Sequence, residues 1–149
     1  RKVREENHFS WEPISEVAII FIGIFVTMTP ALLFLNANAE MFGLSEPREF
    51  FYAAGTLSSF LDNAPTAVAF YTVAQGIATT GGELVAGVSP LILRAISMGA
   101  VYFGSMTYIG NGPNFMVKAI AEKEGVRMPS FFAYIALALV FLLPAYAAV

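Results

Sequence analysis

The chain has 149 residues, of which 57% are hydrophobic and 13% charged, with a formal net charge of -3. Average globular proteins carry about 25% charged residues, so this composition is typical of a membrane protein. The absence of cysteine excludes disulfides, zinc–thiolate sites and thiol nucleophiles. The single histidine, His8, lies in a polar N-terminal stretch, which excludes imidazole ligation of a metal inside a membrane.

The first apolar segment covers residues 14–35 and follows Trp11 in a polar stretch. About 22 helical residues cover about 33 Å, which is enough to cross a bilayer. Pro30 falls in the last turns of this predicted span, where we expect a kink. The chain begins with Arg1 instead of Met and has no evident signal peptide, so we interpret it as a piece of a longer protein.

Two half-length apolar stretches follow, and the polar sequence 62–66 separates them. Each stretch is long enough to reach the middle of a bilayer as a helix but too short to cross it. Backbone groups freed at such a break must face protein or a water-filled cavity. The sequence therefore predicts a re-entrant helical hairpin over 50–77, with its tip at 62–66.

A second interrupted segment covers 91–126 and contains the sequence Gly-Asn-Gly-Pro-Asn at 110–114. It is too long for one straight span, and it predicts a broken transmembrane helix. Residues 129–149 carry no charge and predict a last span. Together these elements predict an all-α membrane protein that forms a single membrane domain.

The basic residues predict an orientation in the membrane. Six of the eight precede the first or the last predicted span, namely Arg1, Lys2, Arg4, Lys118, Lys123 and Arg127. Lysine and arginine beside short loops mark the cytoplasmic side, so we expect the loops around Lys2 and Lys123 there. The hairpin would then open to the outside, and the loop near Glu46 would be external.

Asp62 is the only aspartate, and no other charged residue lies between Phe50 and Gly82. A carboxylate at membrane depth is costly unless it binds a cation, a proton or a partner. Asp62 is therefore a candidate for ion binding. Its alternative role is an N-cap of the second hairpin helix, and the two roles are compatible.

The two breaks have matching sequences, because residues 63–66 and 111–114 each read Asn, small, Pro, polar. Proline fits the first turn of a helix, so each break can end one half-helix and begin another. Secondary transporters use such breaks as sites, where helix C-termini hold sodium and helix N-termini hold anions. Small residues at Gly104, Ser105, Gly110 and Gly112 would let the two breaks approach each other closely.

Oxygen-bearing side chains and backbone groups at the breaks form the candidate ion- and substrate-binding site. Its predicted members are Ser58, Ser59, Asp62, Asn63, Thr66, Thr107, Gly110, Asn111, Gly112 and Asn114. Asp62, Asn63 and Asn111 are the predicted metal ligands, and sodium fits them because hard cations prefer oxygen. Glu83 and Arg94 are interpreted as interface residues, and Lys118 as a residue that snorkels to the cytoplasmic face.

At the two breaks, residues 58–66 and 107–115 resemble the NhaD-type sodium:proton antiporters of the ion transporter superfamily, which also includes arsenite permeases and citrate carriers. The resemblance implies an elevator transporter of two inverted repeats, with this chain as the C-terminal part of the second repeat. It also implies a multi-pass homodimer in the bacterial inner membrane. Its partners would be the lipid bilayer and the missing first repeat of the same polypeptide, with no nucleic acid. No cofactor is implied beyond sodium as the transported or coupling ion.

Sodium:proton antiport is the favoured function, because the tip reads Asp-Asn-Ala-Pro-Thr where carboxylate carriers have a Ser-Asn-Thr type tip. The alternative is a sodium-coupled carrier of citrate, a dicarboxylate or another anion. An intramembrane protease would need a second carboxylate or a base beside a serine, so no enzyme is expected. A purely structural membrane subunit would tolerate alanine at Asp62, Asn63 and Asn111.

Overall fold

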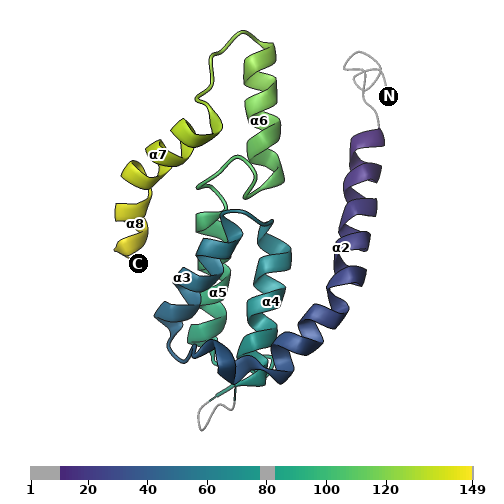
Figure 1. Ribbon diagram of the computed structural model, residues 1–149, viewed down its shortest axis with the longest axis vertical. Coiled ribbons are helices and arrows are strands. Elements are labelled where there is room, and N and C mark those ends of the chain that lie inside the picture. The colour runs from purple at the N-terminus through teal and green to yellow at the C-terminus, as the bar shows by residue number, and fades with distance from the viewer. Residues whose placement is uncertain (1–10, 78–82, 149) are drawn as a thin grey trace.

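The computed structural model of the chain describes residues 11–77 and 83–148, so Arg1, Lys2, Arg4 and His8 lie outside the described residues. The described part is all-helical apart from one isolated bridge between Val85 and Val88, which confirms the predicted all-α class for this part. In chain order (Figure 1) the elements are α2 (Glu12–Ala37), η1 (Ala39–Phe42), α3 (Pro47–Ser58), α4 (Asn63–Gly76), α5 (Pro90–Phe103), α6 (Gly112–Lys123), α7 (Phe131–Phe141) and α8 (Leu143–Ala147).

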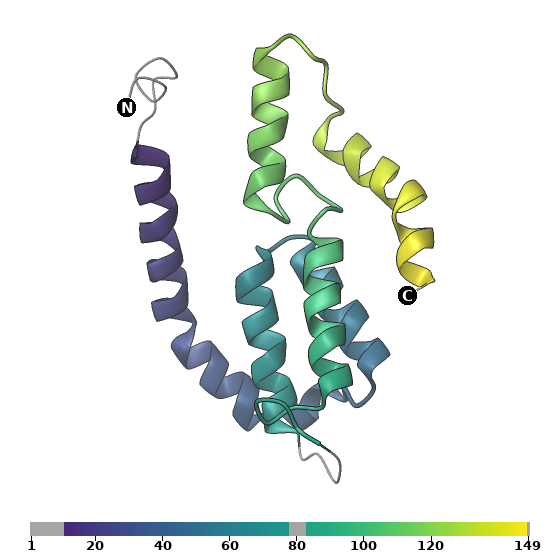
Figure 2. The same ribbon diagram turned by 180° about the vertical axis from the view of Figure 1, so that it is seen from behind.

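Helix α2 contains the first predicted span, 14–35, and it bends part-way along its length (Figures 1 and 2). Pro30 lies inside the helix. Proline cannot donate the backbone hydrogen bond of a helix interior and crowds the preceding turn, which makes it a common cause of such bends.

Helices α3 and α4 form the two arms of the predicted hairpin, and the chain reverses direction between them. Both helices begin earlier than the apolar pattern predicts, because polar caps extend them toward their N-termini. The Asp62 side chain caps α4, so Pro65 and Thr66 already lie in the first turns of that helix. Glu49 accepts a hydrogen bond from the backbone N–H of Glu46 at the start of α3.

Helices α5 and α6 form the predicted broken helix, but the break lies further toward the N-terminus than predicted. Helix α5 ends at Phe103 and α6 begins at Gly112, so the non-helical segment starts at Gly104 instead of Gly110. Pro113 and Asn114, which the sequence places in the break, are part of the first turn of α6.

The predicted last span, 129–149, is not one helix. Helix α7 ends at Phe141, and α8 begins at Leu143 with Pro144 in its first turn. Proline favours the start of a helix over its interior, which accounts for the division. Among the described residues, no helix has both the length and the apolar character needed to cross a membrane.

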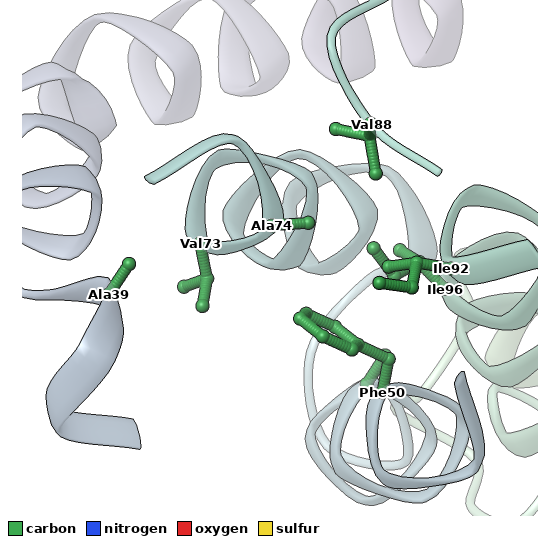
Figure 3. Packing of buried hydrophobic residues seen from close by; sticks show 8 residues of the cluster. Ala39, Phe50, Val73, Ala74, Val88, Ile92 and Ile96 are labelled. Carbon is green, nitrogen blue, oxygen red and sulfur yellow. The ribbon is translucent and has the colours of Figure 1, made fainter. Parts of the chain in front are cut away.

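The core joins η1, α3, α4 and α5 (Figure 3). Its buried members are Ala39, Phe50, Ala54, Val73, Ala74, Val88, Ile92 and Ile96. Helix α3 packs closely against α5, because Gly99 has no side chain where it meets the backbone carbonyl of Phe51. A second cluster, formed by Phe51, Phe103, Met106 and Ala138, attaches α7 to the same pair of helices.

The directions of the four central helices position the two breaks (Figures 1 and 2). Helices α3 and α5 run side by side in the same direction, and α4 runs in the opposite direction. Helix α6 continues beyond the end of α5. The C-terminal ends of α3 and α5 and the N-terminal ends of α4 and α6 consequently meet at one level of the molecule.

Candidate functional site

The candidate site lies where these four helix ends meet. Carbonyl groups in the last turn of a helix and N–H groups in its first turn lack partners within the helix. The ends of α3 and α5 therefore contribute partial negative charge, and the starts of α4 and α6 contribute partial positive charge. The tip–break cluster is our name for the predicted site residues at these helix ends and in the break, namely Ser58, Ser59, Asn63, Thr66, Thr107, Gly110 and Asn111.

Asn63 connects the two breaks through its amide. The oxygen and nitrogen of an amide are assigned from their neighbours, and one orientation satisfies every neighbour of Asn63. In this orientation Nδ2 lies 2.9 Å from the carbonyl oxygen of Ala100, 2.9 Å from Ser58 Oγ and 3.2 Å from the carbonyl oxygen of Gly110. Oδ1 accepts a hydrogen bond from Asn111 Nδ2 at 3.1 Å. The first residue of α4 is thus bonded to the N-cap of α6.

Three hydroxyl groups attach the end of α3 to α5 and to the break. Ser58 Oγ donates to the carbonyl oxygen of Ala100, and Ser59 Oγ donates to that of Phe103 at 3.3 Å. Thr107 Oγ1 donates to the carbonyl oxygen of Ser59 and accepts a hydrogen bond from Gly110 N at 2.9 Å. All three hydroxyl-bearing residues are buried, so these hydrogen bonds fix the hairpin tip against the break.

Two glycines make this close approach possible, as the small residues of the break predict. A Cβ atom at Gly110 would lie 2.7 Å from the carbonyl oxygen of Gly104 and 2.9 Å from those of Ser58 and Ser59. A Cβ atom at Gly104 would overlap the amide of Asn63. Three backbone carbonyl oxygens therefore converge on Gly110, and no larger residue fits between them without a shift of the backbone.

Thr66 is the one described residue with a buried side-chain oxygen that lacks a hydrogen-bond partner. Its side chain is 1% exposed in the second turn of α4, and its backbone N–H bonds to the carbonyl oxygen of Asp62. A buried hydroxyl without a partner is costly. Such groups are rare in folded proteins and call for an explanation, of which an ion ligand is one.

Asp62 forms the predicted N-cap, because Oδ1 accepts a hydrogen bond from Ala64 N at 3.3 Å. Its side chain is partly buried. Within the described part of the chain, the carboxylate has no hydrogen bond to Asn63, Asn111 or the hydroxyl groups of the cluster. The predicted role of Asp62 as an N-cap of α4 is therefore confirmed. The proposed ligand set Asp62, Asn63 and Asn111 stays a prediction.

The remaining predicted site residues lie at the start of α6. Asn114 Nδ2 donates to the carbonyl oxygens of Gly104 at 2.8 Å and Thr107 at 3.1 Å, so it holds the loop of the break closed. Gly112 is exposed, and nothing lies near the position of a Cβ atom there. Asn114 thus supports the backbone of the site, and the structure gives Gly112 no contact with the cluster.

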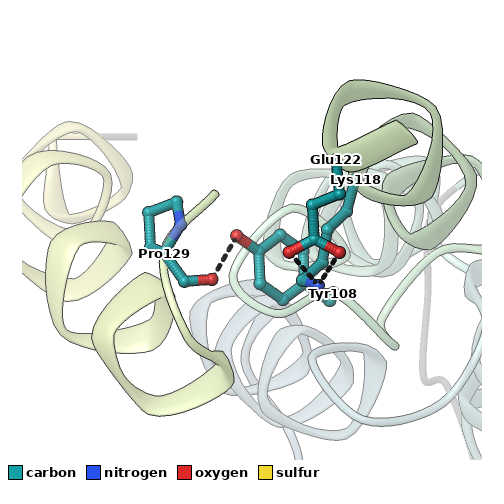
Figure 4. A network of polar contacts seen from close by, with 4 residues as sticks. All are labelled: Tyr108, Lys118, Glu122 and Pro129. Carbon is teal, nitrogen blue, oxygen red and sulfur yellow. Dashed lines mark hydrogen bonds and ion pairs between the residues drawn. The ribbon is translucent and has the colours of Figure 1, made fainter. Parts of the chain in front are cut away.

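Lys118 lies further along α6 and is part of a separate network (Figure 4). Its Nζ is 2.7 Å from Glu122 and 5.5 Å from the ring centre of Tyr108. Tyr108 donates a hydrogen bond to the carbonyl oxygen of Pro129 at 3.0 Å. This network attaches α6 to the break and to the segment before α7. Arg94 and Glu83 are both exposed and make no contact with the cluster among the described residues.

The sequence predicted backbone groups of the breaks in the site, but it did not identify the backbone acceptors in the last turn of α5. The carbonyl oxygens of Ala100 and Phe103 receive three hydrogen bonds from the hairpin tip, and an apolar side chain gives no sign of this. It also missed Tyr146 on α8, which donates to the carbonyl oxygen of Tyr102 at 2.7 Å and bonds to Ser105 at the same distance. Tyrosines on either side of the break were the only sequence signal that could have suggested such polar contacts near it.

A family model described as "Putative citrate transport" matches residues 1–149. No curated protein and no solved structure matches the chain. The family match agrees with the ion transporter superfamily that the two break motifs resemble, and it does not separate NhaD-type antiporters from citrate carriers. Because the match covers all 149 residues, the chain belongs to this citrate-transport family and is a membrane transport protein.

Proposed function

We propose that the chain takes part in secondary active transport and that the tip–break cluster binds the coupling cation. The observation that carries the proposal is the hydrogen bond between Asn63 and Asn111, where the ends of four helices meet. Breaks of this kind at the middle of a membrane protein are typical of transporters, because free helix ends bind ions there.

The donor atoms favour an alkali cation. The cluster presents hydroxyl, amide and backbone carbonyl oxygens, and the carbonyl oxygens of Ser58, Ser59 and Gly104 converge on Gly110. Sulfur and imidazole, which favour transition metals, are absent from the cluster. The unpaired Thr66 hydroxyl adds an oxygen with a free lone pair. A sodium ion would gain these ligands in exchange for part of its hydration shell.

Sodium:proton antiport is the first proposed activity, and Asp62 is the proposed exchange group. A carboxylate can hold either a proton or a cation, and binding of one excludes the other. If sodium binds on one side of the membrane and a proton on the other, that competition produces antiport. Asp62 lies at the tip of the hairpin beside the cluster, as an exchange group should.

Sodium-coupled carriage of citrate is the second proposed activity, and two observations favour it. The family match is to citrate transport. The N-terminal ends of α4 and α6 both face the cluster, and helix N-termini attract carboxylates. The negative charge of Asp62 would oppose a citrate ion unless a cation neutralised it, so this activity also needs cation binding at the cluster.

The same proposal predicts that the chain is part of a larger assembly. A second hairpin and a second broken helix, in the opposite orientation, would complete an inverted-repeat transporter that works as an elevator. We expect a multi-pass homodimer in a bacterial inner membrane. The helical hairpin and the interrupted helix α5–α6 described above are the two kinds of element that each such repeat contains.

Replacement of Asp62 by asparagine in the full-length protein tests the proposal. Asparagine is as good an N-cap as aspartate, so α4 should remain intact. Everted vesicles with Asp62→Asn should lose the sodium-induced response of a pH-sensitive dye, while Glu124→Gln, an exposed acid at the end of α6, should respond as wild type.

Uptake of radiolabelled citrate by the same vesicles separates the two activities. For the wild-type protein, antiport predicts a dye response without sodium-dependent citrate uptake. Citrate carriage predicts sodium-dependent citrate uptake without a dye response. Wild-type dye response and wild-type citrate uptake in Asp62→Asn would contradict a transport role for this carboxylate.

A further inference from the structure

A second site lies near the N-terminal ends of α3 and α5, away from the tip–break cluster at their C-terminal ends. Residues of α3 and α5, with Ala147 of α8, line a cavity of about 450 Å³ that is open to the surface. Two arginines line it, Arg48 from α3 and Arg94 from α5. The rest of the lining is mainly apolar and includes Phe51, Leu91 and Met98. None of these five residues belongs to the transport site proposed above.

The two arginines give the cavity a positive charge that the described residues leave uncompensated. Neither guanidinium takes part in an ion pair within residues 11–77 and 83–148. Arg48 lies 5.8 Å from the ring centre of Tyr52, which also lines the cavity. Helices α3 and α5 both begin at this end of the molecule (Figure 1). The N-terminal end of α5 adds partial positive charge, whereas the carboxylates of Glu46 and Glu49 cap that of α3.

The acidic groups at the start of α3, Glu46 and Glu49, are not among the residues that line the cavity. Glu49 directs its carboxylate to the start of the helix, where the backbone N–H groups of Glu46 and Ser45 donate to it at 2.9 and 2.7 Å. These bonds hold the pKa of Glu49 below its ordinary value, so it is ionised at neutral pH. Neither Glu46 nor Glu49 lines the cavity, so neither occupies the place of an anion between the arginines.

We propose that this cavity binds an anionic phospholipid of the surrounding membrane. The phosphate would lie between Arg48 and Arg94, because guanidinium groups match phosphate oxygens with paired hydrogen bonds. The apolar lining offers a small hydrophilic anion few further partners, whereas it suits the upper part of an acyl chain. Basic pockets between the helices of membrane proteins bind lipid head groups by this combination of charge and apolar surface.

The proposal is tested by lipid titration of the full-length protein in detergent, followed by native mass spectrometry. The probes are phosphatidylglycerol, phosphatidylcholine and glycerol 3-phosphate. Wild type should prefer phosphatidylglycerol to the other two. Arg48→Gln combined with Arg94→Gln should weaken phosphatidylglycerol binding about thirtyfold, which corresponds to about 1 kcal/mol for each basic group that loses its anionic lipid partner. The control pair Lys123→Gln and Arg127→Gln removes equal charge elsewhere and should bind as wild type.

Arg48→Lys combined with Arg94→Lys keeps both charges and should retain most of the preference. Equal binding of phosphatidylglycerol and phosphatidylcholine by wild type would overturn the proposal, because the arginines would then give no preference for an anionic head group. Tighter binding of glycerol 3-phosphate than of the lipid would also overturn it, in favour of a soluble anion. Transport measured on the same variants keeps this result separate from the proposed function.

Discussion

A buried hydroxyl without a partner costs about 1–3 kcal/mol, and Thr66 carries such a group in α4. Thr66→Val removes the hydroxyl and keeps the shape of the side chain. If the hydroxyl is a cation ligand, the full-length variant should be as stable as wild type or more stable, and it should need about tenfold more sodium for half-maximal transport. Thermal unfolding and the sodium dependence of transport measure the two effects.

Thr72→Val is the matched control for this prediction. Thr72 lies on the same helix, and its hydroxyl donates to the carbonyl oxygen of Val68 at 2.9 Å, away from the cluster. The control should leave the sodium dependence unchanged. If Thr66→Val also leaves it unchanged, the Thr66 hydroxyl is no ligand.

Asn63 and Asn111 act as a pair, since one hydrogen bond joins the two breaks. Asn63→Ala leaves the carbonyl oxygens of Ala100 and Gly110 without this donor, and we expect lost transport in a protein that still inserts into the membrane. Asn111→Ala should lose transport as well. In a double-mutant cycle on unfolding, the two effects should differ from additivity by about 0.5–3 kcal/mol, as contacting residues do.

Asn36→Ala provides the comparison for the asparagine pair. Its amide joins α2 to the carbonyl oxygen of Thr72 on α4, so this variant should lose stability but keep transport. Additive effects of Asn63→Ala and Asn111→Ala, together with wild-type transport in both, would rule out the paired site.

At the scale of elements, the contact between α3 and α5 fixes the hairpin beside the broken helix. Gly99→Ala would place a Cβ atom against the backbone carbonyl of Phe51, and a backbone atom cannot move aside cheaply. We expect this variant to lose about 1–3 kcal/mol of stability, as overpacked cores do. Gly23→Ala in α2 meets no atom within 4 Å, so it should gain up to about 1 kcal/mol from helix propensity. Thermal unfolding in detergent compares the two, and equal stability would contradict close packing at Gly99.

The sequence predicted the helical elements better than their ends. The Asn-x-Pro motifs located both breaks, because proline at the start of a helix is a local signal that packing rarely overrides. Helices α4 and α6 begin earlier than the sequence predicted, because Asp62 and Asn111 are their N-caps. Thr66 and Asn114 therefore belong to helices instead of loops. The division of the last segment at Leu142 was also within reach of the sequence, since Pro144 marks the start of α8.

The contacts of the candidate site were predictable only in part. Side-chain types identified Asn63 and Thr107 because amide and hydroxyl groups stand out beside apolar segments, and the glycines because they lie next to these groups in the break. The acceptors are the backbone carbonyls of Ala100 and Phe103, and every residue has such a group. Only the packing of α3 on α5 decides which carbonyls face the tip. The sequence pattern around the two breaks therefore predicted both partners of the Asn63–Asn111 hydrogen bond, but only the donors of the bonds to the carbonyl oxygens of Ala100 and Phe103.

At the scale of the whole molecule, the outer helices expose large apolar side chains. Examples are Ile22 and Leu33 on α2, Val117 on α6, and Phe132 and Phe141 on α7. So many exposed large apolar side chains are unusual on a soluble monomer and favour contact with lipid or with further protein. In a membrane transport protein, acyl chains or neighbouring helices would cover these faces, and the polar tip–break cluster stays enclosed between α3, α4 and α5.

The ends of the molecule give the last prediction. The start of α2 and the end of α6 lie at one end, whereas η1 and the starts of α3 and α5 lie at the other (Figure 1). Lys123 in the last turn of α6 marks the first end, and the distribution of basic residues predicts that this end is cytoplasmic. Met41 in η1 is 79% exposed and marks the opposite end.

Because the 149 residues contain no cysteine, single-cysteine variants can report each end separately. In intact cells, a membrane-impermeant maleimide should label Met41→Cys, and it should label Lys123→Cys only after the membrane is permeabilised. Labelling of Lys123→Cys from outside would reverse the orientation, and the hairpin tip would then be reached from the cytoplasm.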